Sequence, residues 1–392
     1  MLPSYFQVIK KRMRIGIVAG EASGDLLASG LIRAIKAKYP DAVFEGIAGP
    51  AMIEAGCQAI YPAEKLAVMG LVEVLSHYRE LKGIQNAIIK HFVDNPPDVF
   101  IGVDAPDFNL TVERKLKQRG IKTAHYVSPS VWAWRQYRVK KIGRSVDLML
   151  TLFPFEADFY HQHDVAVEFV GHPLAEMIPM QPDMMAARQA LDLPENKQLV
   201  AILPGSRMSE AKMLSQLMFE AAAKISKQQP GVEFVIPLAT AAIREHVESV
   251  LAGMQDRPVL HLIDGRSREV MAAVDVIMLA SGTAALEAML FKRPMVVTYK
   301  LSPLTFAIVK RMIKTEFVSL PNILAGEEVA KELIQDQATA ANLAQESLRL
   351  LQDDGAADAV SERFKNIHQQ LRQDASAKAA DAILSLVETD YR

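Results

Sequence analysis

Short runs of aliphatic and β-branched residues alternate with helical patterns along this chain, and the alternation occurs in two series. The first series has such runs at 15–20, 43–49, 98–104, 123–128 and 148–153, and the second at 199–205, 233–238, 259–264, 275–280 and 295–299. Strands that alternate with helices in this way form βαβ units around parallel sheets. The sequence therefore predicts an α/β fold with two doubly wound domains.

The segment VGHPLAEMIPMQPD at 170–183 separates the two series. Its three prolines disfavour both a continuous helix and a central strand, so we expect the domain boundary there. Ligands of doubly wound sheets bind at the carboxyl ends of the strands. Functional residues are therefore expected where each predicted strand ends.

Composition excludes several classes of protein. The net charge of −2 argues against a nucleic-acid binder, because no overall basic excess is present to neutralise phosphates. The single cysteine, Cys57, cannot form an internal disulfide, which fits a reducing compartment. No apolar run approaches the roughly 18–20 residues that cross a bilayer, and the first residues lack the apolar stretch of a secretory signal. We expect a soluble or peripherally bound cytoplasmic protein.

Two strand-end segments of the second series have features of an anion site. In SGTAALE (281–287) a tight turn of Ser281, Gly282 and Thr283 leads into a helix that carries Glu287. In LPGSR (203–207) the turn ends in Ser206 and Arg207. Helix starts bind phosphates and the arginine fork suits a diphosphate. Ordinary helix caps and an exposed arginine are the alternative interpretations.

The first series offers weaker candidates. VAGEASGD (18–25) is either a phosphate-binding turn or a packing turn, and it matches neither G-x-G-x-x-G nor a Walker sequence. Asp104 lies at the end of an apolar strand in GVDAPDFN (102–109). Its two alternative roles are to cap the next helix and to act as a base. A structural hydrogen bond is the favoured role for His125. The H-x-H pair at 161–163 lacks a third ligand and no D-x-D occurs, so we expect no metal.

Six segments together resemble one family of enzymes. VAGEASGD, GVDAPDFN, HYVSPSVWAWR (125–135), LPGSR, LASGTAALE (279–287) and VSLPNILAG (318–326) follow one another in the order found in lipid-A-disaccharide synthases. The resemblance extends from about residue 14 to about residue 388. It leaves out residues 1–13, so Met13 is an alternative start to Met1.

The resemblance implies an inverting glycosyltransferase of the GT-B fold in lipopolysaccharide synthesis. It would join UDP-2,3-diacylglucosamine to 2,3-diacylglucosamine 1-phosphate through a β-1,6 bond and release UDP, without a cofactor or metal. Residues 1–175 would form the acceptor-binding Rossmann-like domain and 176–365 the UDP-sugar-binding one. Residues 366–392 would form a helical tail that crosses back to the N-terminal domain.

The resemblance also implies roles for single residues. Asp104 would be the catalytic base. The nucleotide-sugar site would use Ser206, Arg207, Ser281, Gly282, Thr283, Glu287 and Asn322, with Glu287 on the ribose hydroxyls. The acceptor site would use Glu21, Ser23, Gly24, Asp25 and His125.

Acylated substrates imply contact with lipid. The segment 66–81 is rich in apolar residues, and Val68, Met69, Leu71, Val72 and Leu75 are its candidates for membrane or acyl-chain contact, with a buried helix as the alternative. The basic and apolar segment 302–314 is a second candidate. We expect a cytoplasmic protein on the cytoplasmic face of the inner membrane. A homodimer that exchanges C-terminal segments stays open.

Two other functions stay open on the sequence. UDP-N-acetylglucosamine 2-epimerases share the two-domain architecture and a nucleotide-sugar site, so the fold by itself does not exclude an isomerase. A non-catalytic nucleotide-sugar-binding protein would bind UDP without turnover. Formation of the 2-epimer would identify the first, and unchanged function after Asp104→Ala would identify the second.

Overall fold

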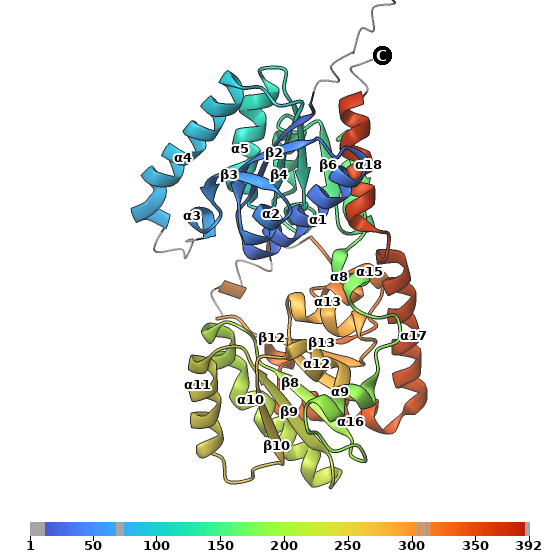
Figure 1. Ribbon diagram of the computed structural model, residues 1–392. Coiled ribbons are helices and arrows are strands. Elements are labelled where there is room, and N and C mark those ends of the chain that lie inside the picture. The colour runs from blue at the N-terminus through green and yellow to red at the C-terminus, as the bar shows by residue number, and fades with distance from the viewer. Residues whose placement is uncertain (1–11, 68–73, 303–304, 307–310, 313, 389–392) are drawn as a thin grey trace, which may run out of the picture. The chain divides into compact units, whose positions relative to one another are not determined.

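A computed structural model describes residues 12–67, 74–302, 305–306, 311–312 and 314–388. The described chain divides into two compact units (Figure 1). Unit 1 comprises Met1–Pro173 with Gln373–Arg392, and unit 2 comprises Leu174–Arg372. Each unit has its own parallel sheet with helices between the strands, which confirms the predicted α/β class.

Within the described residues, the sheet of unit 1 has seven parallel strands in the order β3-β2-β1-β4-β5-β6-β7. Their bounds are β1 Arg14–Ala19, β2 Val43–Ala48, β3 Cys57–Pro62, β4 Val99–Val103, β5 Lys122–Tyr126, β6 Leu148–Thr151 and β7 Val167–Phe169. The edge strands β3 and β7 were not expected from the sequence. Both carry exposed residues along their length and so lack the continuous apolar run of a central strand.

Helices pack on both faces of this sheet. On one face, α1 (Ala22–Lys38) contacts α2 (Pro50–Glu54) and α18 (Ala375–Glu388), and on the other α4 (Val74–Asp94) contacts α5 (Pro106–Lys117). The shorter elements are α3 (Glu64–Ala67), η1 (Gln136–Arg138), α6 (Val139–Gly143) and α7 (Pro154–His161). Gly30 lets α18 approach α1 closely, because a Cβ there would lie 2.6 Å from Ser376 Oγ. The C-terminal helix is thus an integral part of unit 1.

The part of unit 2 that the structure describes forms six parallel strands in the order β10-β9-β8-β11-β12-β13. Their bounds are β8 Leu199–Leu203, β9 Glu233–Leu238, β10 Leu260–Asp264, β11 Val276–Ala280, β12 Met295–Tyr299 and β13 Lys331–Ile334. β8 and β11 lie side by side at the centre and are buried along their whole length. Their carboxyl ends therefore bring the turns after Leu203 and Ala280 together.

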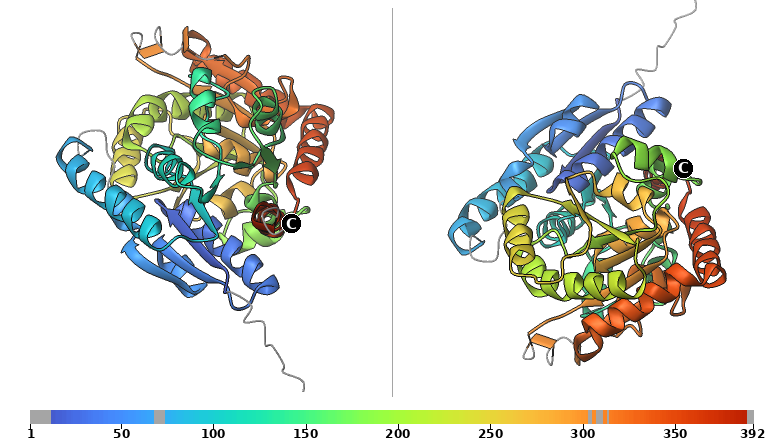
Figure 2. Two further views of the ribbon diagram at one scale, coloured as in Figure 1. Left: turned by 90° about the horizontal axis from the view of Figure 1, so that it is seen from above. Right: turned by 90° about the horizontal axis from the view of Figure 1, so that it is seen from below.

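The helices of unit 2 also form two layers (Figure 2). α10 (Met208–Gln228), α11 (Ala241–Ala252) and α16 (Ala340–Gln352) share one hydrophobic core with the sheet. α9 (Met184–Ala190), α12 (Ser267–Ala273), α13 (Thr283–Leu290), α15 (Leu320–Ala325) and α17 (Asp354–Leu371) contact one another in the second layer. The short α8 (Pro173–Met177) and η2 (Gln335–Gln337) complete the described elements.

The predicted lipid-contact residues are mostly outside the described part of the chain. Val68, Met69, Leu71 and Val72 are not described, and of Leu75 only the backbone, in α4, is described. The segment 302–314 is described at a few positions only. No helix among the described residues is long and apolar enough to cross a membrane.

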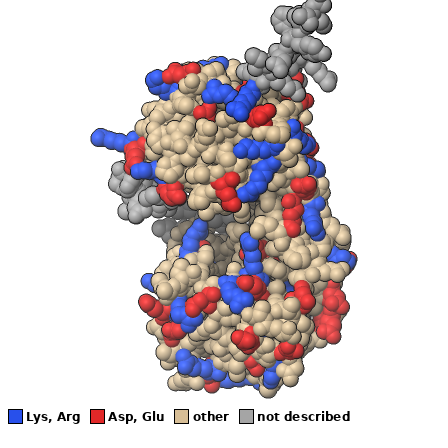
Figure 3. All heavy atoms as spheres, viewed as in Figure 1, with Lys and Arg blue, Asp and Glu red and all other residues tan. Residues whose placement is uncertain are grey.

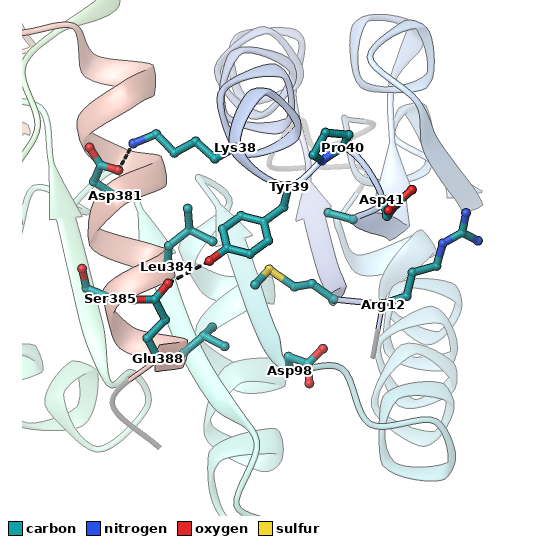
Figure 4. Close-up of a pocket in the computed structure, with 13 residues that line it drawn as sticks. Arg12, Lys38, Tyr39, Pro40, Asp41, Asp98, Asp381, Leu384, Ser385 and Glu388 are labelled. Atoms are coloured by element: carbon teal, nitrogen blue, oxygen red, sulfur yellow. Dashed lines mark hydrogen bonds and ion pairs between the residues drawn. The ribbon is translucent and has the colours of Figure 1, made fainter. Parts of the chain in front are cut away.

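A hollow of about 860 Å³ lies in unit 1 where α1 ends beside α18 (Figure 4). Lys38 forms an ion pair with Asp381, and Tyr39 donates a hydrogen bond of 2.8 Å to Glu388. The hollow lies where β1 and β4 begin, since Met13 and Asp98 line it. Because doubly wound sheets bind ligands at the opposite ends of their strands, we assign these contacts to the attachment of α18.

Candidate functional site

A pocket of about 420 Å³ lies at the carboxyl ends of the central strands of unit 2. It is lined by Leu203, Pro204, Gly205, Ser206, Arg207, Glu210, Pro237, Ala239, Ser267, Met271, Ala280, Ser281, Gly282, Thr283, Ala284, Glu287 and Tyr299. The structure thus brings together LPGSR and SGTAALE, two segments more than 70 residues apart in the sequence. Its volume is in the range of about 300–1,000 Å³ that is usual for small-molecule sites.

The turn before α13 leaves room for a ligand beside the backbone. Gly282 has φ 163° and ψ −162°, an extended conformation, and no described heavy atom lies within 4 Å of the place where its Cβ would be. No side chain caps α13, which begins at Thr283. The first amide groups of this helix and the positive end of its dipole therefore face open space, which favours an anion.

The turn before α10 is shaped by a different glycine. Gly205 has φ +122°, and a Cβ there would lie 2.5 Å from the Cβ of Glu210, so only glycine fits. Arg207 then precedes the first residue of α10 with its side chain 80% exposed. Its one ion pair in the described structure is to Glu210 at 3.4 Å, a long and solvated contact that costs little to break.

Glu287 lies one turn into α13 and is held by a residue that the sequence did not indicate. The Oε1 atom of Glu287 accepts a hydrogen bond from Arg268 Nε at 2.9 Å and forms an ion pair with Arg268 Nη2 at 2.8 Å. The Glu287 side chain is only 15% exposed. Arg268 thus holds the carboxylate through one oxygen, and the other oxygen is left for a hydroxyl group.

In unit 1, Asp104 lies at the carboxyl end of β4 in an unusual backbone conformation. Asp104 and Ala105 have φ values of 54° and 43°, a region that costs a non-glycine residue of order 1–3 kcal/mol. The amide of Asp104 donates to Tyr126 O at 2.9 Å, and Asn109 Nδ2 donates to Asp104 O at 2.8 Å. No described residue donates a hydrogen bond to the Asp104 carboxylate. The turn is fixed while its side chain stays available.

The turn after β1 lies against this same turn. A Cβ on Gly20 would lie 2.7 Å from the Cβ of Ala105, and one on Gly24 would lie 3.6 Å from the Cβ of Asp104. Glu21 and Ser23 are exposed, and Gly24 is buried. The two strand-end turns of unit 1 therefore form one continuous feature, as adjacent parallel strands require.

Asp25 differs from the expectation of a ligand contact. Its carboxylate accepts hydrogen bonds from the amides of Gly49 at 3.0 Å, Ala51 at 2.9 Å and Met52 at 3.0 Å. The side chain is buried and satisfies the amides at the start of α2. We therefore assign it to the attachment of α2.

His125 and Asn322 are also occupied within the fold. His125 is fully buried with Nδ1 2.7 Å from Glu113 Oε1, and burial raises the pKa of Glu113 although His125 lowers it. The amide of Asn322 donates to Ala330 O at 2.7 Å and to Glu332 Oε1 at 2.9 Å, and its oxygen accepts from two backbone amides. Both side chains are fully buried, and the His125 Nε2 atom has no hydrogen-bond partner among the described residues.

The motif HYVSPSVWAWR contains a second buried acid contact. Trp132 Nε1 donates to Glu156 Oε1 at 3.1 Å, and Phe153 N donates to Glu156 Oε2 at 3.2 Å. Burial raises the pKa of Glu156 to about 8. This contact anchors the segment that follows β5 to the start of α7.

Comparison with solved structures identifies the fold. A UDP-GlcNAc 2-epimerase from Neisseria meningitidis bound to UDP-GlcNAc matches 95% of this chain and 100% of its own, with a TM-score of 0.65 and 14% identity. The calicheamicin glycosyltransferase matches 97% of this chain and 100% of its own, with a TM-score of 0.60 and 14% identity. The predicted GT-B architecture is confirmed, and at such identity these likenesses concern the fold alone.

Comparison of sequences identifies the family. The family model described as lipid-A-disaccharide synthetase matches residues 15–385. A lipid-A-disaccharide synthase of Pseudomonas paraeruginosa is 52% identical over 96% of this chain and 99% of its own, and one of Pseudomonas putida is 54% identical over 95% and 98%. The chain belongs to the lipid-A-disaccharide synthase family.

Proposed function

We propose that the chain joins UDP-2,3-diacylglucosamine to 2,3-diacylglucosamine 1-phosphate, forming a β-1,6-linked disaccharide 1-phosphate and UDP. Its family makes it a glycosyltransferase of lipid A biosynthesis. The identities of the two substrates, the bond formed and the residue roles below are our proposal.

The observation that carries the proposal is the pocket of unit 2, where two helix starts lie beside Arg207. The open side of Gly282 lets a phosphate approach the first amides of α13, and Arg207 supplies a mobile guanidinium for the same diphosphate. Such charge-assisted hydrogen bonds contribute about 1.5–3 kcal/mol each. We assign the UDP moiety of the donor to this pocket, with Ser206, Ser281 and Thr283 as further contacts.

Glu287 suits the ribose of UDP. A largely buried carboxylate that already pairs with one arginine is held in one orientation, and its second oxygen can accept hydrogen bonds from hydroxyl groups. Arg268 is therefore a positioning residue of the nucleotide site. Asn322 supports this unit from within, by tying the start of α15 to β13.

Asp104 is the proposed base. In an inverting displacement, the acceptor 6-hydroxyl oxygen forms a bond to the anomeric carbon while the bond from that carbon to the UDP oxygen breaks. The hydroxyl proton passes to the Asp104 carboxylate, and the electron pair of the broken bond leaves with UDP. The left-handed turn after β4 exposes this carboxylate without a competing hydrogen bond in the described structure. The exposed Glu21 and Ser23 are the proposed acceptor contacts beside it.

Acylated substrates require access to lipid. We propose that the protein acts at the cytoplasmic face of the inner membrane as a peripheral protein. The proposed contacts for acyl chains stay those in the segment 66–81, which are Val68, Met69, Leu71, Val72 and Leu75. A homodimer stays a proposal for its assembly, which light scattering over a range of concentrations tests.

One experiment separates this function from its alternatives. Purified protein is incubated with UDP-2,3-diacylglucosamine, with and without 2,3-diacylglucosamine 1-phosphate, and released UDP and the lipid product are measured. We expect UDP and disaccharide in equal amounts, and only when the acceptor is present. Epimerisation of a UDP-sugar without an acceptor would favour the isomerase. UDP binding without any turnover would favour a non-catalytic protein.

A further inference from the structure

Basic residues are concentrated in one part of unit 1. Residues 108–146 contain ten Lys and Arg and a single acidic residue, Glu113, whereas the whole chain has a net charge of −2. Glu113 is fully buried against His125, so it adds no negative charge to the surface. The ten residues, which we call the basic surface, are Arg114, Lys115, Lys117, Arg119, Lys122, Arg135, Arg138, Lys140, Lys141 and Arg144.

The fold brings these residues onto adjoining segments. The second half of α5 carries the first three, η1 with α6 carries Arg138, Lys140 and Lys141, and Arg135 and Arg144 directly flank η1 and α6. Lys117 Nζ at the end of α5 donates to Gly143 O at the end of α6 at 3.4 Å. Leu110 of α5 and Ile142 of α6 belong to one hydrophobic cluster. The two helices are therefore held together. The exposed basic residues on these adjoining segments are Lys115 of α5, Lys140 and Lys141 of α6, and Arg144 just after α6.

Few acidic groups neutralise this surface. Asp107 pairs with Arg138 at 2.8 Å and Asp147 pairs with Lys117 at 3.0 Å. No ion pair to a described residue occurs for Arg114, Lys115, Arg119, Arg135, Lys140, Lys141 or Arg144. By contrast, acidic and basic side chains are mixed on the face of the molecule in Figure 3. The basic surface therefore has an uncompensated positive charge.

Two exposed aromatic side chains border the basic surface at one end. Trp134 is 38% exposed and stacks with Arg135, whose Cζ lies 4.3 Å from the ring centre, and Tyr137 is 75% exposed. Both lie in the segment after β5. That segment begins at the edge of the sheet where Asp104 lies, since the amide of Asp104 bonds to Tyr126 O. The aromatic end is thus the end nearest the proposed base.

We propose that the basic surface docks unit 1 onto a bilayer that contains anionic lipid. Lys and Arg are attracted to anionic headgroups, and Trp and Tyr favour the interface between headgroups and acyl chains. Docking this way would place the aromatic end, and with it the acceptor site, next to the lipid. The last step rests on the proposed function, whereas the binding itself does not. A nucleic acid would match the charge but gives no reason for aromatic residues at only one end.

The test is binding to vesicles by sedimentation. The protein is mixed with vesicles of phosphatidylcholine that contain phosphatidylglycerol as the anionic lipid, or with vesicles of phosphatidylcholine alone. We expect binding to the anionic vesicles that weakens with added salt. The variant Lys140→Gln/Lys141→Gln/Arg144→Gln should lower the partition coefficient by about 100-fold, since each basic residue at such a surface contributes about fivefold.

Lys224→Gln/Lys227→Gln/Arg257→Gln in unit 2 is the matched control, with the same loss of charge from exposed positions. Tyr137→Ser should weaken binding by a few fold through loss of the interfacial ring. Equal losses in the two triple variants, or none in the first, would overturn the proposal. So would binding of RNA that competes fully with vesicles and also depends on Lys140, Lys141 and Arg144. Because sedimentation needs no turnover, loss of the proposed activity would leave this result readable.

Discussion

Replacement of Gly282 by alanine should separate ligand binding from folding. The backbone of Gly282 is extended, and an added Cβ would meet no described heavy atom within 4 Å. An alanine in a compatible conformation reduces the freedom of the unfolded chain and stabilises a protein by about 0.4–1 kcal/mol. We therefore expect the free energy of unfolding to be unchanged or slightly higher.

The same methyl group would occupy the space through which a phosphate approaches α13. Loss of one charge-assisted hydrogen bond of about 1.5–3 kcal/mol weakens binding by roughly tenfold to 150-fold. Calorimetric titration with UDP measures this loss, and urea denaturation measures the stability of the same sample. UDP affinity equal to that of the wild type, in a folded Gly282→Ala protein, would refute the placement of the diphosphate.

Two other glycines are controls for this experiment. Gly253, which follows α11, has φ −81° and its nearest heavy atom would be 3.6 Å from an added Cβ. Gly253→Ala should leave both UDP affinity and folding intact. Gly205→Ala should instead destabilise the fold, because its φ is +122° and the added Cβ would collide with Glu210.

Three further predictions concern unit 1. Asp104→Asn should lower turnover by about 10²–10⁴-fold and leave UDP affinity unchanged, as UDP release and calorimetry would show; turnover near that of the wild type would exclude Asp104 as the base. Asn109→Ala removes the side-chain amide that donates to Asp104 O, so it should lower the free energy of unfolding by about 1–3 kcal/mol. It should also lower turnover more than it changes the KM for the donor. Turnover and stability equal to those of the wild type would argue against a role of Asn109 in holding the Asp104 turn. Burial raises the pKa of Glu156 from 4.5 to about 8, so the folded chain keeps a proton there that the unfolded chain has lost above pH 4.5, and stability should fall by on the order of 5 kcal/mol as pH rises from about 4.5 to 8. Denaturation of Glu156→Gln over that range should show a shallower fall, and parallel curves would contradict the assignment.

The central strands could be predicted from the sequence because both of their faces are buried. β1, β4, β8 and β11 are continuous apolar runs, which few other structures explain. The edge strands β3 and β13 have exposed positions and resemble loops in the sequence. What makes them strands is pairing with β2 and β12, which a local pattern does not contain.

The grouping of LPGSR with SGTAALE was also predictable, because the carboxyl ends of neighbouring parallel strands share an edge. Arg268 was not predicted. It lies 19 residues before Glu287, and their contact depends on the packing of α12 against α13. No spacing rule connects two helices that are separated by a strand.

The sequence by itself determined the fold class, the family and the strand ends at which functional residues lie, because burial of whole strands and short motifs are local properties. It did not show that Asp25 is satisfied within the fold whereas Asp104 is not, since each is a carboxylate at or just after a strand end. Only the tertiary structure did: the amides at the start of α2 satisfy Asp25, while no described residue donates to the Asp104 carboxylate. Whether a polar side chain is occupied depends on donors brought from distant parts of the chain, and those donors exist only once the chain has folded.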